Sequence, residues 1–366
     1  MIIRLKWYKN IIVISMILLI GIISGCNNSV ESPTTTDTTS QNTLSTKTSI
    51  NNTISPPTMV TKEKYADYIS ECDTPVGAIS PDASWAVTNC THNNETGMYV
   101  WKIGEQKSIR LFQLNMPVYA FPYFSPDGTK LLVVIENEPW WLFEVGKWQT
   151  PKKLLSASKV HAGPTWSPDS QSIAVTDLEE GWALSILKLD GTFRHLIPYR
   201  EGNNEISNPA WSPDSMKIAY MITVDMLAPH TLELSLVDVG TGNYDLVYTK
   251  EDGEYLYNRL KWSPDGRYIL LINDDILNQD DLFLYDVKDN NIIVLSEFGN
   301  TFTAIWSPDS QYFCIEDKDT TDVYLFSIVT NEYYLLGSFS RPLLWIDDKS
   351  IIIQQQDKNF YLISWK

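Results

Sequence analysis

Short apolar runs alternate with polar turns along most of the chain, and the same turn recurs at regular intervals. Six apolar runs lead into a Ser-Pro-Asp turn and are followed by a second apolar run; the turn serines are Ser80, Ser125, Ser167, Ser212, Ser263 and Ser307. Ser at the first position of such a turn, Pro at the second and Gly at the fourth favour a type I β-turn, and the Ser and Asp side chains bond to nearby backbone N–H groups. Each copy therefore predicts a β-hairpin.

The repeat contains two further strands. Successive turn serines are 42 to 51 residues apart, and a third and a fourth apolar run follow each hairpin, for example at 140–145 and 152–157. Four short strands in roughly 44 residues are the signature of a propeller blade. A weaker seventh hairpin occupies 343–353. We expect an all-β chain folded as a β-propeller of seven four-stranded blades, with six blades as the alternative.

The seventh repeat supplies three strands, and an N-terminal segment is placed to supply the fourth. Segment 64–70 precedes Ser80 by the interval that separates a fourth strand from the next turn elsewhere. We expect this segment to pair into the last blade and close the ring, because closure satisfies strand edges that would otherwise be unpaired.

These hairpins carry a family resemblance. The S-P-D-G and S-P-D-S turns, four of them preceded by Trp166, Trp211, Trp262 or Trp306, resemble the WD40-like repeat of TolB and of prolyl-oligopeptidase-type propellers. The resemblance covers about residues 63–366 and implies a propeller domain, which we place at 61–366. It implies a fold and not a function. The α/β domain of TolB has no counterpart here, the G-x-S-x-G of the peptidases is absent, and so are the Gly-His and Trp-Asp signatures of WD40 blades.

The N-terminal segment is typical of an exported protein. Three cations precede the apolar run 11–20, which predicts a signal peptide over 1–25. Residues 23–26, Ile-Ser-Gly-Cys, resemble the lipobox of bacterial lipoproteins, which implies cleavage before Cys26 and a diacylglycerol- and palmitate-bearing cysteine; an uncleaved anchor is the alternative. Nearly half of the residues that follow are Ser or Thr, so 26–60 is predicted to be a disordered tether. We expect an extracytoplasmic protein, lipid-anchored to the bacterial membrane.

Three further cysteines lie in the predicted propeller. Cys72 stands just before the first inner strand, and Cys90 ends the strand that pairs with it. Outside the cytoplasm such a pair favours a disulfide between Cys72 and Cys90, with two buried thiols as the alternative. Cys314 lies in an apolar strand and is expected to be a core thiol.

The chain is strongly acidic, and many of its carboxylates lie in predicted loops. A net charge of −17 argues against nucleic acid as a partner. In a propeller, the loops that join second and third strands share one face with the starts of the first strands. Carboxylates recur in these loops and form a candidate binding face for a basic partner, although solvated acidic loops are the simpler interpretation. The candidate face comprises Asp177, Glu179, Glu180, Asp225, Asp274, Asp275, Asp280, Asp281, Glu316, Asp317, Asp319 and Asp322.

A second set of residues leads into the inner strands, near the mouth of the central channel. This candidate channel mouth comprises Tyr119, His161, Asn208, Tyr257, Arg259 and Arg341. The four histidines occupy different positions in their repeats, so we expect no His-based metal site and no cofactor. Calcium is the alternative, because Asp317, Asp319 and Thr321 alternate as oxygen ligands would, although the Gly and Glu of the EF-hand loop are missing.

Taken together, these features predict a non-catalytic binding module for a protein, a peptide or an envelope polymer, with membrane contact through the lipid anchor only. The alternative is a propeller enzyme, a hydrolase or a lyase, with its site at the channel mouth.

Overall fold

The described part of the protein is built of β-strands. The computed structural model describes residues 59–69, 72, 74, 76–92, 95–114, 120–135, 138–155, 163–177, 183–198, 205–206, 209–224, 230–253, 259–272, 282–295, 301–317, 320–338 and 341–365. All of them lie in one compact unit. In these ranges the chain forms no helix of the length and apolarity that a bilayer crossing requires. The predicted signal peptide, Cys26 and nearly all of the predicted tether fall outside them.

The strands form seven sheets, each built from one stretch of chain except the last. Blade 1 contains β2 (Ala78–Ile79), β3 (Trp85–His92), β4 (Glu95–Lys102) and β5 (Ser108–Gln113). Blade 2 contains β6 (Ala120–Phe124), β7 (Lys130–Ile135), β8 (Trp140–Glu144) and β9 (Lys152–Leu155). Blade 3 contains β10 (Thr165–Trp166), β11 (Ser172–Asp177), β12 (Ala183–Lys188) and β13 (Phe193–Ile197). Blade 4 contains β14 (Glu205–Ile206), β15 (Ala210–Trp211), β16 (Lys217–Val224), β17 (His230–Asp238) and β18 (Tyr244–Gly253).

The remaining blades follow the same order. Blade 5 contains β19 (Arg259–Trp262), β20 (Tyr268–Ile272), β21 (Leu282–Asp286) and β22 (Asn291–Leu295). Blade 6 contains β23 (Thr301–Trp306), β24 (Tyr312–Asp317), β25 (Asp322–Ser327) and β26 (Glu332–Ser338). Blade 7 contains β27 (Arg341–Asp347), β28 (Ser350–Gln354), β29 (Phe360–Trp365) and, from the other end of the chain, β1 (Met59–Ala66).

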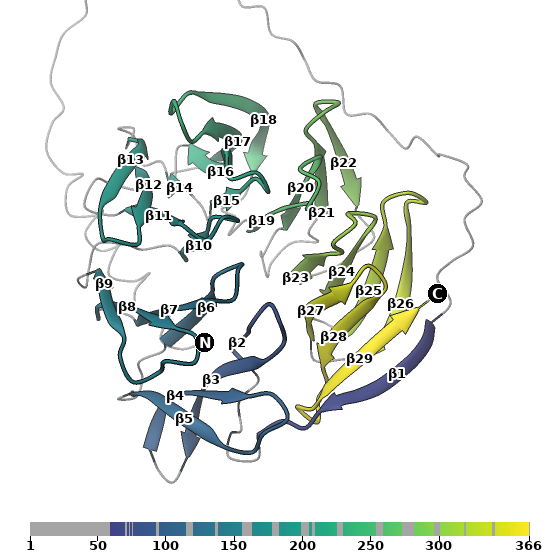
Figure 1. The fold of residues 1–366 in the computed structure, drawn as a ribbon. Coiled ribbons are helices and arrows are strands. Elements are labelled where there is room, and N and C mark those ends of the chain that lie inside the picture. The colour runs from purple at the N-terminus through teal and green to yellow at the C-terminus, as the bar shows by residue number, and fades with distance from the viewer. Residues whose placement is uncertain are drawn as a thin grey trace, which may run out of the picture. The chain divides into compact units, whose positions relative to one another are not determined.

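The seven sheets are the blades of a seven-bladed β-propeller, and the six-bladed alternative is wrong. The blades succeed one another around a ring, with the first strand of each nearest the centre and the fourth at the outside (Figure 1). Blade 4 departs from the pattern. There β14 and β15 both pair with β16, so two short strands share the innermost position.

The core is divided among the gaps between neighbouring blades, and each gap holds its own hydrophobic cluster. Strand β16 shows why. Ile218 and Tyr220 face blade 3, whereas Ala219 and Met221 face blade 5. Because both faces of a blade are covered, its middle strands are continuously apolar rather than alternating. Cys314 is a thiol buried between blades 6 and 7.

Side chains in the Ser-Pro-Asp turns bond to the turn backbone. In blade 2, Ser125 Oγ donates to Asp127 Oδ1 (2.6 Å) and accepts from the N–H of Lys130 (2.9 Å). Asp127 Oδ1 in turn accepts from the N–H of Thr129 (2.9 Å). The fourth turn residue, Gly128, has φ +69°, a left-handed conformation that suits glycine. The corresponding Ser–Asp bonds occur in the other five turns.

Tryptophans that precede the turns link each of blades 3 to 7 to the blade before it. The indole N–H of Trp211 donates to the carbonyl of Thr165 in blade 3 (3.0 Å). Four more tryptophans donate to the preceding blade over 3.0 to 3.2 Å, namely Trp166, Trp262, Trp306 and Trp345. The sequence repeat therefore determines the contacts between blades as well as the blades themselves.

Turn serines at the fourth position add a second link between blades. Ser170 Oγ accepts from the N–H of Asp127 in blade 2 (3.0 Å), and Ser310 Oγ accepts from the N–H of Asp265 in blade 5 (3.0 Å). Gly adopts the left-handed conformation of this position without strain, whereas Ser adds a hydrogen bond to the turn of the neighbouring blade.

The ring is closed by β1, which pairs antiparallel with β29. The predicted closing strand at 64–70 is misplaced, because β1 begins at Met59, before the propeller boundary at residue 61. The chain then crosses to blade 1 through residues that bond to both blades. The N–H of Tyr68 donates to Asn359 Oδ1 (3.0 Å), and its hydroxyl donates to the carbonyl of Thr74 (2.5 Å).

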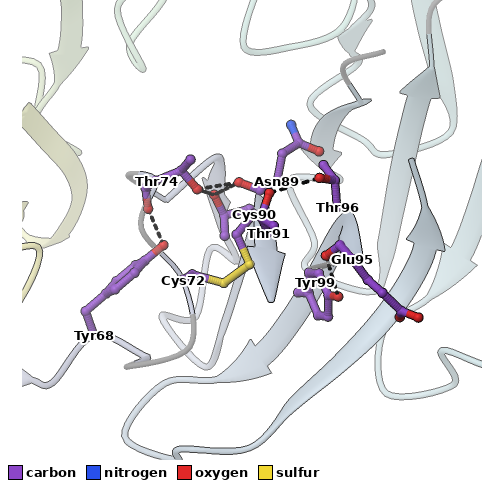
Figure 2. Close-up of a disulfide and its surroundings, with 10 residues drawn as sticks. Tyr68, Cys72, Thr74, Asn89, Cys90, Thr91, Glu95, Thr96 and Tyr99 are labelled. Carbon is purple, nitrogen blue, oxygen red and sulfur yellow. Dashed lines mark hydrogen bonds between the residues drawn. A yellow bond between two sulfur atoms is a disulfide. The ribbon is translucent and has the colours of Figure 1, made fainter. Parts of the chain in front are cut away.

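The structure joins Cys72 of this crossing to Cys90 of β3 in a disulfide, with a Cα–Cα distance of 5.3 Å. Figure 2 shows the disulfide beside Thr74, whose hydroxyl donates to the carbonyl of Asn89. Both sulfurs belong to the hydrophobic cluster between blades 7 and 1. The covalent bond therefore lies at the one joint of the ring that is closed by distant parts of the sequence.

Candidate ligand-binding face

Strand register defines one face of the ring, the loop face, where the second strands end and the first strands begin. Arg259, the first residue of β19, pairs with Ile272, the last of β20. Arg341 at the start of β27 likewise pairs with Gln354 at the end of β28. Loops between second and third strands therefore share a face with the channel mouth, as the repeat predicts.

Most members of the predicted acidic face lie outside the described residues. These are Glu179, Glu180, Asp225, Asp274, Asp275, Asp280, Asp281 and Asp319, and of Asp177 only the backbone is described, as the end of β11. The described members are Glu316, Asp317 and Asp322 at the β24–β25 connection.

These three acids interact with their surroundings. Asp317 Oδ1 accepts from the N–H of Thr320 (3.2 Å), and Asp322 Oδ1 accepts from the hydroxyl of Ser338 (2.5 Å). Glu316 lies close enough to Arg341 for an electrostatic interaction. Asp317 thus shapes its own loop, and Asp322 bonds to the end of the neighbouring strand β26. Calcium binding stays a prediction because Asp319 is outside the described residues.

Of the predicted channel mouth, Arg259 and Arg341 are described, whereas Tyr119, His161, Asn208 and Tyr257 are not. Arg341 is half-buried, and burial lowers the pKa of its guanidinium, while Glu316 and Tyr68 act in the opposite direction. Glu316 is on blade 6 and Arg341 on blade 7, so this interaction joins two blades.

Three channel residues were missed by the sequence analysis. Phe121 and Tyr123 of β6 and Lys261 of β19 lie on inner strands. The side chain of Lys261 reaches solvent, yet enough protein surrounds it for desolvation to lower its pKa, and repulsion by Arg259 lowers it further. Because β19 is the innermost strand of its blade, the exposed side chain of Lys261 lies toward the centre of the ring. The signal was present in the sequence as a lysine between two apolar residues, Leu260 and Trp262.

The described residues contain no group of three or more His, Cys, Asp or Glu side chains that could hold a metal ion. Among these residues, the inner strands carry the cations Arg259, Lys261 and Arg341 and the exposed ring of Phe121, and the β24–β25 connection carries three carboxylates.

Comparison with known proteins identifies the fold. No protein-family model matches the chain, and no curated protein matches it. An oligogalacturonate lyase from Vibrio parahaemolyticus is 11% identical, with a TM-score of 0.61 over 84% of this chain and 97% of that chain. An oligogalacturonate lyase in complex with manganese is 14% identical, with a TM-score of 0.60 over 85% of this chain and 97% of that one. A chain of the mitotic checkpoint complex is 12% identical, with a TM-score of 0.57 over 88% and 98%.

All three structures are less than 25% identical to this chain, so the likeness establishes the propeller architecture alone.

Proposed function

We propose that the protein is a lipid-anchored, extracytoplasmic binding module whose loop face binds a cationic partner, either a basic protein or a cationic envelope polymer. The observation that carries the proposal is the strand register, which brings the starts of the first strands and the ends of the second strands to one face. In the sequence, segment 273–281 connects Ile272 and Leu282, the end of β20 and the start of β21, and these two described residues lie at that face.

The charge of the connecting segments supplies the second step. Segment 273–281 alone contributes four carboxylates, Asp274, Asp275, Asp280 and Asp281, within a chain of net charge −17. Carboxylates gathered on a rigid ring produce a negative potential that speeds the approach of a cationic partner. Such an association weakens as salt rises, because the screening length falls to about 3 Å at 1 M.

The test is affinity capture from solubilised envelope with the protein as bait, washed at low and at high salt. Changing all four of these aspartates to asparagine is expected to abolish capture of a basic partner. The matched control changes four acids away from the loop face, Glu63, Glu105, Asp245 and Asp348, and is expected to retain capture. Salt-insensitive capture, or equal loss in both variants, contradicts the assignment of the loop face.

Anchoring is tested separately. Metabolic labelling with an alkyne-tagged fatty acid is expected to mark the wild-type protein and to fail with Cys26→Ser, which would also move the protein from the membrane to the soluble fraction. Labelling that survives Cys26→Ser contradicts lipidation at this residue.

A propeller enzyme with its site at the channel mouth is the second candidate function. It is supported by the cationic side chains of Arg259 and Lys261 in the channel, together with the fold shared with two lyases. Incubation with oligogalacturonate, followed by ultraviolet detection of unsaturated products, tests the lyase case. Absence of product at high protein concentration removes that activity and leaves the binding module.

A further inference from the structure

Two inner strands present side chains to the channel although they lie in the middle of the ring. Phe121 of β6 is 49% exposed, and Lys261 of β19 is also exposed. Neighbouring blades cover both faces of an inner strand, and the second strand of the blade covers one edge. Exposure at these positions is therefore exposure to the channel or to its mouth at the loop face. A half-exposed phenylalanine is a group that a ligand can cover.

The two strands occupy equivalent places on opposite sides of the ring. Phe121 and Arg259 each stand four residues before the turn serine of their blade, and Tyr123 and Lys261 each stand two residues before it. Their blades, 2 and 5, are three positions apart in a ring of seven. Figure 1 shows β6 and β19 on different sides of the centre.

The backbone at both positions is fixed by contacts between blades. The carbonyl of Tyr123 accepts from the indole of Trp166 (3.0 Å), and the carbonyl of Lys261 accepts from the indole of Trp306 (3.2 Å). The equivalent residues of blades 3 and 4 are small, Thr165 and Ala210, and the Thr165 hydroxyl is bonded to the carbonyl of Pro209 (2.9 Å). The two blades between the aromatic strand and the cationic strand thus carry small side chains at this position.

The electrostatics agree with this geometry. Among the described residues Lys261 has no carboxylate partner, and the charge of Arg259 repels it. Burial raises the pKa of the Tyr123 hydroxyl, and Arg259 opposes that rise across the channel. An anion bound between these groups would relieve the repulsion between the two cations.

We propose that the central channel binds a small ligand in which a carboxylate is attached to a ring. Arg259 and Lys261 bind the carboxylate, because a guanidinium matches its two oxygens and an ammonium adds a point charge. Phe121, which is 49% exposed, covers the face of the ring. A single negative charge suits the site better than several, since the chain as a whole is strongly acidic. This site is separate from the acidic face, so failure here leaves the capture experiment unaffected.

Two probes distinguish the sources of such a ligand, and each has a neutral partner. D-glucuronate with glucose represents acidic sugars, and 4-hydroxyphenylacetate with tyrosol represents aromatic acids. Titration calorimetry on the intact protein is expected to detect at least one carboxylate and neither neutral compound. Binding by glucuronate alone assigns an acidic sugar, and binding by the phenylacetate alone assigns an aromatic acid. Failure of both carboxylates at millimolar concentration, or equal binding of the neutral partners, overturns the proposal.

Variants connect the binding to the channel. Lys261→Gln is expected to weaken binding roughly tenfold to a hundredfold, the effect of losing one hydrogen bond to a charged group. Lys349→Gln, at an exposed turn on the opposite face, is the matched control and is expected to leave affinity unchanged. A second readout does not depend on affinity: ligand binding should raise the pKa of Lys261, observed by NMR of methylated lysines. Equal affinities in both variants, or an unmoved Lys261 resonance at saturation, would refute the site.

Discussion

The tryptophan links between blades can be tested by removing one indole N–H and keeping an aromatic ring. Trp211→Phe deletes the donor to the Thr165 carbonyl (3.0 Å) at a residue that is 7% exposed. Losing the bond and leaving a carbonyl without its partner costs about 1–3 kcal/mol. The smaller ring buries less apolar area, which costs about 1 kcal/mol more. We therefore expect the free energy of unfolding to fall by about 2–4 kcal/mol.

Trp148 supplies a matched control within the same fold. It is 5% exposed and packs on Trp85 with 5.1 Å between ring centroids, but its indole N–H has no hydrogen-bond partner among the described residues. Trp148→Phe loses similar area and breaks no bond, so its cost should be about 1 kcal/mol or less. Urea unfolding followed by far-ultraviolet circular dichroism measures both, provided that the m-value is common to the variants. Equal destabilisation would show that the indole bonds contribute nothing beyond ring burial and would refute the reasoning.

Three further predictions concern closure of the ring and its turns. Cys72→Ser breaks a link between residues 18 apart and should lower stability by about 3 kcal/mol, as should reduction of the wild type, with no added effect of reductant on the variant. A chain that starts at residue 67 lacks β1 and should melt at lower temperature and aggregate through the exposed edge of β29, whereas a chain that starts at 59 should melt like the wild type. Hydrogen bonds from Ser212 and from the N–H of Met216 hold the pKa of Asp214 below its ordinary value, so the unfolded chain takes up a proton first as pH falls. The stability that ionised Asp214 gives the folded state is present above about pH 4 and is lost as pH falls through its folded pKa. Stability should therefore fall less steeply with acid in Asp214→Asn than in the wild type, and an identical acid profile would contradict this.

The closing strand shows where sequence reasoning reached its limit. Its existence followed from the count of strands, but its position did not follow from the apolar pattern. Residues 62–65 of β1 are exposed and mostly polar, so they give no apolar strand pattern. Tyr68 and Ile69 have the residue types of a strand, but they pack in the crossing between blades 7 and 1. An outer strand faces water on much of its surface, and hydrophobic periodicity is a weak guide to its bounds.

The candidate site was predicted unevenly for a related reason. Strand order was enough to predict that loops and channel mouth share a face, and Arg259 and Arg341 lie there. The electrostatic interaction of Arg341 with Glu316 across two blades required side-chain positions, because these residues are far apart in the repeat. Lys261 was missed because its apolar neighbours, Leu260 and Trp262, predict a buried strand.

The repeat predicts the fold so well, and the ligand so poorly, because its residues act on the backbone. Trp166 and Trp306 bond to the carbonyls of Tyr123 and Lys261, not to their side chains. The same bond from Trp211 is made to Thr165, and from Trp262 to Ala210. An aromatic, a cationic, a hydroxyl and a methyl side chain thus occupy one structural position without altering the contact that builds the ring. The side chains of the channel can vary with the ligand at little cost in stability, and information about function therefore resides in the positions where the repeats differ.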